Sequence, residues 1–270
     1  MKLRVVELLL VTTLPALFLA ADGIPPLDIS IATLVGGTLA AGAANAFNMV
    51  IESDIDKVMK RTEKRPIVNE QISESQALTF AFAITTLSLA IFWIFTNPLA
   101  TGLTVGAIAF YVFGYTVGLK RRTSQNIVWG GIAGCLPVLI GWAAVTGSIS
   151  WIAFWFFMVI FFWTPPHFWA LAIKYKNDYA AAGIPMLPVV APIRKVAQQM
   201  WFHTIAMIAT SFLTLYSAGF APWSYLITAI LGLAFAFQLR KPAENSGAIF
   251  HGSITYLSLY SILLVVGVFI

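Results

Sequence analysis

Nine apolar stretches, each long enough to cross a lipid bilayer, divide this sequence of 270 residues. A spanning helix needs about 20 residues, because it rises about 1.5 Å per residue and the hydrocarbon core is about 30 Å thick. The sequence therefore predicts an all-α, polytopic membrane protein in which residues 1–270 form one transmembrane domain. The predicted spans cover, to within a few residues, about 5–21, 29–51, 76–96, 99–119, 127–146, 150–173, 200–219, 222–239 and 248–269.

Basic residues are confined to one set of alternate connections between these stretches. All 16 Lys and Arg residues lie in the N-terminus or in segments 52–75, 120–126, 174–199 and 240–247. Short loops rich in Lys and Arg stay on the cytoplasmic side of a membrane. The pattern predicts a multi-pass protein of the cell membrane, with its N-terminus and its polar loops on the cytoplasmic side. It also explains the net charge of +5 without a nucleic-acid partner.

A polar patch ends the second stretch. Asn48, Glu52 and Asp56 are four residues apart, and this spacing places them along one face of a helix. Carboxylates spaced in this way can share a hard cation such as Mg²⁺, which also binds waters and substrate phosphates. Asp54 lies off that face and would reach the same ion only if the helix unwinds. A solvated helix end with ordinary ion pairs explains the same spacing, so both interpretations stay open.

Bases continue the pattern just beyond these acids. Lys57, Arg61 and Arg65 repeat the four-residue step, and guanidinium groups bind phosphate in a bidentate manner. A second basic cluster at 120–122 follows the fourth stretch. At minimum, this cluster marks the cytoplasmic side of the membrane.

A second polar group follows the sixth stretch, in the segment WTPPHFWALAIKYKND. His167, Lys174 and Asp178 are separated by seven and four residues, so a continuous helix would carry them on nearly one face. The preceding Pro165 and Pro166 are expected to break the span just before His167 and to free backbone carbonyls inside the membrane. His167 is a candidate metal ligand, haem-iron ligand or general base. A hydrogen-bonded intramembrane histidine and an interfacial Lys174–Asp178 ion pair explain the pattern equally well. His203 and His251, at the starts of two later stretches, are expected at the membrane interface near the cytoplasmic face.

Glycines punctuate the segment VWGGIAGCLPVLIGWAAV. The positions concerned are Gly130, Gly131, Gly134 and Gly141. Glycine allows helices to approach closely in a membrane, and it also leaves room for a bulky planar ligand. The sequence does not separate these two uses.

The chain as a whole resembles the intramembrane aromatic prenyltransferase superfamily. The resemblance runs through LLLVTTLPALFLA, NMVIESDIDKVMKRTEKRP, YTVGLKRRTSQNIVWGGIAGCLPVLIGWAAVTG and WTPPHFWALAIKYKNDYAAAGIPMLPVV. The first superfamily motif, Asn-x3-Asp-x3-Asp, is matched by Asn48, Glu52 and Asp56, with Glu in place of the first Asp. The second, Asp-x3-Asp, is matched at Lys174 and Asp178, where a base replaces the first acid. The segment TPPHFWALA resembles the branch of protohaem IX farnesyltransferases, or haem O synthases.

That resemblance implies a bundle of nine spans around a central cavity. The implied reaction transfers a farnesyl group from farnesyl diphosphate to a vinyl group of protohaem IX (haem B), with Mg²⁺ as cofactor. The implied metal ligands are Asn48, Glu52, Asp54, Asp56 and Asp178. The implied diphosphate-binding residues are Arg61, Arg65, Lys120, Arg121, Arg122 and Lys174. The implied catalytic residues are Asn48, Asp56 and His167, of which His167 would contact haem iron or take the proton of the water that completes the product.

Three other functions are compatible with the sequence: a prenyltransferase that acts on a quinone precursor or a chlorin, an ion-coupled transporter, and a haem-binding assembly factor without catalysis. A transporter is less expected, because the sequence has no convincing inverted repeat and its polar groups gather at one face. The expected partners are farnesyl diphosphate, haem B and the lipid bilayer. A downstream haem A synthase and assembly proteins of a terminal oxidase are candidate protein partners.

Overall fold

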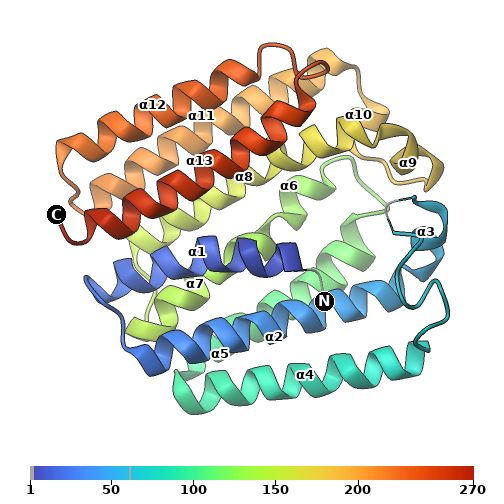
Figure 1. The fold of residues 1–270 in the computed structure, drawn as a ribbon, viewed down its shortest axis with the longest axis horizontal. Helices are drawn as coiled ribbons and strands as arrows, with labels where there is room; N and C mark the ends of the chain where they lie inside the picture. Colours follow the sequence, from blue (N-terminus) through green and yellow to red (C-terminus); the bar gives the residue numbers. More distant parts are fainter. Residues whose placement is uncertain (1–2, 61) are drawn as a thin grey trace.

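The computed structural model describes residues 3–60 and 62–270, with side chains from residue 11 onward. Every regular element within these residues is a helix, and the long helices lie side by side in one elongated bundle (Figure 1). The elements in chain order are α1 (Leu3–Ala21), α2 (Leu27–Ile51), α3 (Ser53–Val58), α4 (Glu74–Phe95), α5 (Pro98–Ala109), the π-helix η1 (Phe110–Leu119), α6 (Asn126–Gly130), α7 (Ile132–Thr146), α8 (Trp151–Lys174), α9 (Lys176–Ala181), α10 (Leu187–Val190), α11 (Ile193–Ser217), α12 (Pro222–Gln238) and α13 (Ser246–Gly267).

Six of the described helical segments are long and apolar enough to cross a membrane, judged by length and composition. They are α2, α4, α5 with η1, α6 with α7, α8 and α13. Val11–Ala21 of α1 and Pro222–Gln238 of α12 are shorter apolar helices, and α11 begins with two bases, Arg194 and Lys195. Each predicted span therefore coincides with a helix or with two consecutive helices, and the prediction of an all-α, multi-pass membrane protein is confirmed.

The connections that carry the described bases lie together at one end of the bundle. Figure 1 shows α3, α9 and α10 at this end, and the connections α4–α5, α7–α8 and α11–α12 at the other. We call the first end the α3 end. The separation of charge that the sequence predicts is therefore present in the fold.

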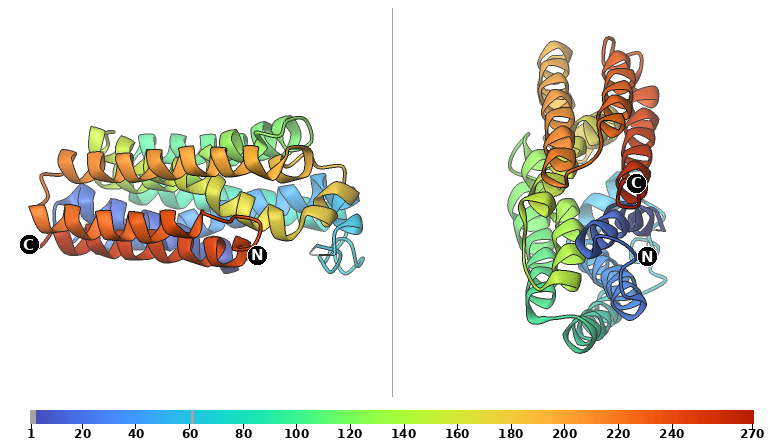
Figure 2. Two further views of the ribbon diagram at one scale, coloured as in Figure 1. Left: turned by 90° about the horizontal axis from the view of Figure 1, so that it is seen from above. Right: turned by 90° about the vertical axis from the view of Figure 1, so that its left-hand side faces the viewer.

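Helix α8 lies at the centre of the packing, against α7, α11 and α13. Its side chains Phe156 and Trp169 are fully buried, as are Tyr256 and Tyr260 of α13. Viewed end-on, the bundle is elongated, with α11–α13 at one extremity and α4 at the other (Figure 2). Large apolar side chains, such as Phe82 on α4, remain exposed on its flanks. Such surfaces suit contact with lipid.

Local sequence explains where several helices begin and end. Ser73 and Gln76 form a reciprocal capping box at the start of α4. Asn97 caps α5, and Pro98 follows at the first helical position, where its missing N–H costs nothing. Gly147 ends α7 with a φ of 66°, a conformation that glycine adopts without steric cost. These signals set the helix ends at the turns expected from the sequence.

Two spans differ from the simple helices that the sequence predicts. The fourth changes from α-helix to π-helix at Phe110, and the fifth divides between Gly130 and Ile132. A Cβ atom on Gly130 would lie 2.1 Å from Tyr115 Cδ2, so glycine is needed for this close approach. A Cβ atom on Gly134 would meet no atom within 4 Å. Close helix approach is thus confirmed at Gly130, whereas Gly134 faces open space.

The two consecutive prolines do not interrupt α8. The sequence predicts a break before His167, but the helix is continuous from Trp151 to Lys174 with Pro165 and Pro166 inside it. Proline holds φ near a helical value, and neighbouring groups in a membrane protein can satisfy the carbonyls that its missing N–H leaves free, so the helix can continue. The predicted cavity at the centre of the bundle stays a prediction.

Candidate functional site

Three polar side chains of the first motif are buried where α2 meets α3. Asn48 is 3% exposed, Glu52 is fully buried and Asp56 is 2% exposed. The helix axis changes at Glu52, which has φ −107° and ψ 18°. The backbone bonds Glu52 N–Asn48 O and Asp56 N–Glu52 O, of 3.0 and 2.9 Å, still connect the two helices. Buried charges are costly unless they are paired, so their partners define the site.

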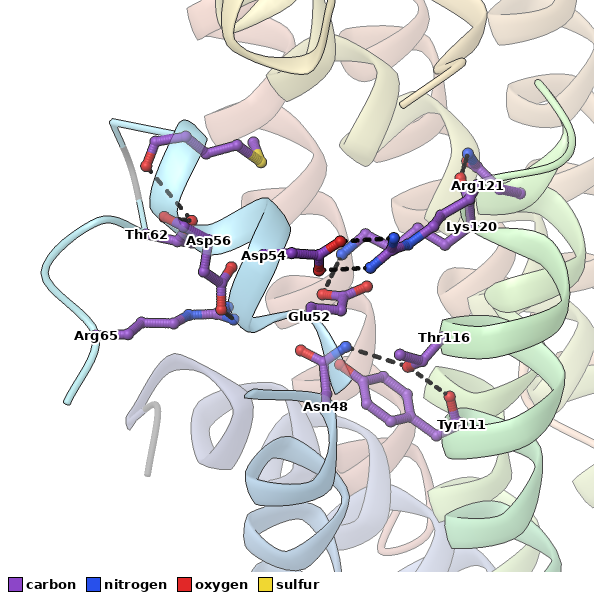
Figure 3. A network of polar contacts seen from close by, with 12 residues as sticks. Asn48, Glu52, Asp54, Asp56, Thr62, Arg65, Tyr111, Thr116, Lys120 and Arg121 are labelled. Atoms are coloured by element: carbon purple, nitrogen blue, oxygen red, sulfur yellow. Dashed lines mark hydrogen bonds and ion pairs between the residues drawn. The ribbon is translucent and has the colours of Figure 1, made fainter. Parts of the chain in front are cut away.

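Two of these side chains pair, as the rungs of a ladder, with Thr116 on η1 and with Lys120, the residue directly after η1. Asn48 Nδ2 donates to Thr116 Oγ1 at 3.1 Å, and Lys120 Nζ donates to Glu52 Oε2 at 2.5 Å. Both members of each rung lie four residues from the members of the other, and Figure 3 shows them facing one another across the gap between the helices. Thr116 Oγ1 in turn donates to the carbonyl of Tyr111, five residues earlier, as the wider π-helical turn allows.

Asp56 has its own basic partner on the other side of α3. The guanidinium of Arg65 donates to the Asp56 carboxylate, and both side chains are largely buried, at 10% and 3% exposed. Thr62, between them in sequence, donates to the Asp56 carbonyl at 3.3 Å. The connection after α3 therefore folds back over the end of α2. It brings Arg65, whose guanidinium group can bind phosphate, to the first motif.

Asp54 and Arg121 form a more exposed pair between the α3 segment and the connection after η1. The Arg121 guanidinium donates two bonds to the Asp54 carboxylate, of 2.7 and 2.8 Å, and the side chains are 42% and 64% exposed respectively. Hydrogen bonds from Arg121 lower the pKa of Asp54, and the same pairing raises the pKa of Arg121. Arg121, predicted to bind diphosphate, is thus held by an acid in this structure.

An open pocket of about 400 Å³ lies beside this pair. It is lined by Ile51, Ser53, Asp54, Thr116, Val117 and Arg121. Lys120, next to it in the chain, is largely buried, and desolvation lowers the pKa of its ammonium against the opposing attraction of Glu52. An anion that approaches this ammonium group would stabilise its charged form.

Oxygen and nitrogen atoms without partners occur at the same place. Glu52 Oε1 and Arg65 Nε are buried and have no hydrogen-bond partner among the described residues. Asn126, just after the basic cluster, donates Nδ2 to the Lys120 carbonyl at 3.1 Å, and its buried Oδ1 has no partner within the described part of the chain. Unsatisfied buried polar atoms are rare in native structures and call for an explanation.

The other predicted site residues are not part of this cluster. Arg61 lies outside the described residues. Arg122 and Lys174 are exposed, and Asp178 is half-buried on α9. No hydrogen bond or ion pair among the described residues joins these three to the first motif. Nor do three His, Cys, Asp or Glu side chains gather closely enough to hold a metal within the described part of the chain.

The predicted common face of His167, Lys174 and Asp178 is interrupted. Helix α8 ends at Lys174 and α9 begins at Lys176, and Tyr175 between them has a non-helical ψ of 29°. Lys174 Nζ lies 5.7 Å above the Tyr175 ring. No ion pair between Lys174 and Asp178 occurs among the described residues.

His167 occupies a separate, aromatic site between α8 and α13. It is 8% exposed, and its ring stacks between Trp163, at 4.3 Å between centroids, and Phe250, at 4.5 Å. Its Nδ1 lies 2.8 Å from Ser253 Oγ. Sequence analysis identified His167 but neither of its partners on α13, because no local spacing links residues 86 positions apart.

His203, which the sequence placed at the membrane interface, is buried instead. It is 4% exposed, lies edge-on to Trp169 at 5.3 Å, and forms a 2.8 Å hydrogen bond with the Gln199 carbonyl. Its position near the start of α11 suggested the interface, but α11 packs closely along α8 there. His251, by contrast, is exposed, and its position at the interface stays a prediction.

Comparison with known proteins agrees with the family resemblance of the sequence. The profile of the UbiA prenyltransferase family matches residues 9–262. The chain is 50% identical to a protoheme IX farnesyltransferase of Frankia casuarinae, over 96% of this chain and 92% of the relative. It is 47% identical to that of Streptomyces avermitilis, over 100% and 92%.

Solved structures with the same fold are more distant in sequence. A UbiA homolog from Aeropyrum pernix K1 superimposes with a TM-score of 0.77 at 17% identity, covering 100% of this chain and 98% of that one. A UbiA homolog from Archaeoglobus fulgidus bound to GPP and Mg²⁺ gives 0.70 at 16% identity, with 98% of both chains covered. At this identity the likeness concerns the fold.

Proposed function

The chain belongs to the UbiA prenyltransferase family, and on that premise we propose that it transfers a farnesyl group from farnesyl diphosphate to a vinyl group of protohaem IX, forming haem O. The observation that carries this proposal is the 50% identity to a protoheme IX farnesyltransferase over nearly the whole chain. The buried acids and bases around Asn48 supply the polar site that a diphosphate needs, and the aromatic site around His167 suits a flat apolar acceptor.

Asn48, Glu52 and Asp56 fit a magnesium ion. All three offer oxygen ligands, which Mg²⁺ prefers, and Mg²⁺ in such sites is shared with substrate phosphates. Glu52 Oε1 is buried without a partner among the described residues, and a cation would satisfy it. The bound ion would neutralise the charge that develops on the departing diphosphate. Asp54 would contribute only after release from Arg121, and Asp178 stays a candidate from the family motif.

Lys120 and Arg65 would bind the diphosphate. Both bases are held beside buried carboxylates, so an arriving diphosphate would find them already in place and would compete with those acids for them. Preorganised positive charge in a largely dehydrated site stabilises a leaving anion more strongly than it would in water. Arg121 lines the adjoining pocket and would add a guanidinium once it leaves Asp54.

In the proposed reaction, the polar site around Asn48 holds the departing diphosphate and the aromatic site around His167 holds the acceptor. The C1–O bond of farnesyl diphosphate breaks, and its electron pair leaves with the diphosphate. The vinyl π electrons then form the new C–C bond to C1, and water adds to the resulting cation and gives up a proton. The rings of Trp163 and Phe250 would stabilise positive charge and exclude water from unproductive positions, and His167 would take that proton or contact the haem iron.

Orientation follows from the charge distribution. We place the α3 end on the cytoplasmic side of the cell membrane, because the connections that carry the described bases lie there and short basic loops stay in the cytoplasm. Farnesyl diphosphate would then enter from the cytoplasm, with its chain in the bilayer. A haem A synthase or an oxidase assembly protein would receive the product.

The direct test is turnover by the purified protein in lipid nanodiscs. With farnesyl diphosphate, Mg²⁺ and haem B, we expect a product of the mass of haem O, and loss of that product in Asp56→Asn. Glu244→Gln, an exposed surface acid paired with Lys241, is the matched control and should retain activity. Prenylation of a quinone precursor or a chlorin in place of haem would change the acceptor in this proposal. Haem binding without any product would contradict the proposal.

A further inference from the structure

Ser253 holds two aromatic side chains of α8 at once. Its backbone carbonyl accepts a hydrogen bond from Trp163 Nε1 at 2.7 Å, and its hydroxyl oxygen lies 2.8 Å from His167 Nδ1. The side chain of Ser253 is fully buried. One residue of α13 therefore fixes both the histidine and the indole stacked on it.

The direction of the hydrogen bonds follows from counting protons. A serine hydroxyl has a single proton, and Ser253 Oγ lies 2.7 Å from the Phe250 carbonyl, which can only accept. The hydroxyl proton is therefore used on Phe250, and only the lone pairs of Oγ face the histidine. The 2.8 Å contact is a hydrogen bond only if His167 Nδ1 carries a proton and donates it.

The ring has no freedom to reverse this arrangement. Trp163 lies nearly parallel to it at 20°, Phe250 at 28°, and Phe168 meets it edge-on at 4.9 Å. Exchange of the two ring nitrogens would require a flip between two stacked rings. No carboxylate is among the hydrogen-bond partners of His167 in the described residues, so the geometry favours a neutral ring with a bare Nε2.

We infer that Ser253 is a positioning residue for the prenyl acceptor: it fixes His167 as the Nδ1–H tautomer and so presents the Nε2 lone pair to the bound haem. This inference rests on the proposed function for the identity of the acceptor. Histidines that bind metals usually donate their other N–H to a protein oxygen, which sets the tautomer and the ring orientation. The Ser253 hydroxyl supplies that oxygen here.

The first test needs no substrate. The chain has three histidines, so the full-length protein labelled with ¹⁵N-histidine in nanodiscs gives three sets of ring signals, and His167→Gln identifies the one of interest. We expect His167 to show a protonated Nδ1 and a bare Nε2, Ser253→Thr to keep this pattern, and Ser253→Ala to lose the single tautomer. A protonated Nε2 in the wild type, or an unchanged tautomer in Ser253→Ala, would overturn the inference.

The second test adds the acceptor. With haem B bound, we expect Ser253→Ala to change the Soret band and to lower kcat on the order of 10-fold, the size seen when such partners of metal-binding histidines are removed. The KM for farnesyl diphosphate should stay nearly constant, and Ser253→Thr should restore both properties. Ser261→Ala on the same helix, which loses a bond to the Val11 carbonyl, is the matched control and should behave as wild type.

The two tests separate the failure of the inference from that of the function. If the wild type forms no haem O while the tautomer results hold, the proposed function fails and the role of Ser253 as the partner of His167 stands. If haem O forms and Ser253→Ala matches the control in tautomer and in kcat, the role of Ser253 fails alone.

Discussion

Among the described residues, Lys120 is the one basic partner of the fully buried Glu52 carboxylate. The two side chains are 1% and 15% exposed and form a 2.5 Å contact. Removal of one member of a buried ion pair leaves an uncompensated charge, whereas replacement of both members is often neutral. The pair is therefore expected to contribute mainly to the function and little to the net stability.

We predict that single substitution at this pair destabilises the protein more than double substitution does. Lys120→Met should lower the free energy of unfolding by about 3–5 kcal/mol, because Glu52 would stay buried without its partner. Glu52→Gln combined with Lys120→Met should recover most of this loss, yet remain inactive. Equilibrium unfolding in mixed micelles measures the stability of both variants. A double variant as unstable as the single one would show that the pair itself stabilises the fold.

Among the helices, close approach is decided by single glycines. Helix α6 touches η1 at Gly130, where a methyl group would overlap the Tyr115 ring, while Gly134 on α7 has free space around it. η1 carries Thr116 and leads directly into Lys120, so its distance from α6 is coupled to the position of the ladder that holds Asn48 and Glu52. The packing at Gly130 therefore affects the polar site of Asn48 and Glu52 through η1.

A matched pair of substitutions separates packing from helix propensity. Gly130→Ala should destabilise the protein by about 1–3 kcal/mol through overpacking. Gly134→Ala should be neutral or stabilising by up to about 1 kcal/mol, because alanine favours the helix. Thermal unfolding of the two variants beside the wild type provides the comparison. Equal destabilisation of both would contradict the assigned role of Gly130.

The Asp54–Arg121 pair joins two connections at the α3 end, and its pH dependence follows from the pKa shifts. The pKa of Asp54 is lowered below its usual value of about 3.9, so its contribution is present above that value and is lost as the pH falls through the lowered pKa. Arg121, with a raised pKa, stays charged throughout.

We therefore expect these two connections to stay together from pH 5 to pH 9 and to separate only below about pH 4. Spin labels at Lys57 and Gln125 would report the distance between them. Asp54→Asn should broaden the distance distribution at every pH. A transition between pH 5 and 9 in the wild type would show that another group controls this contact.

At the scale of the whole molecule, the sequence predicted the features that arise from local patterns. The nine apolar stretches, the one-sided bases and the spacing of Asn48, Glu52 and Asp56 all depend on helical periodicity and on the length of a membrane span. The pairing of Glu52 with Lys120, 68 residues away, depends on how helices pack, and no spacing in the sequence encodes it. For the same reason, the sequence did not identify Thr116 and Ser253 as site residues. Only the fold places their hydroxyl groups beside Asn48 and His167.

Our central claim is that the buried group around Glu52 holds a magnesium diphosphate, and the Kd of farnesyl diphosphate at fixed Mg²⁺ tests it most directly. We predict that Glu52→Gln raises this Kd about 10-fold or more, because a charge-assisted contact contributes about 1.5–3 kcal/mol. Asp54→Asn, which alters only the exposed pair with Arg121, should change it less than about threefold. Unchanged affinity in a folded Glu52→Gln variant, or a larger loss in Asp54→Asn, would contradict this account.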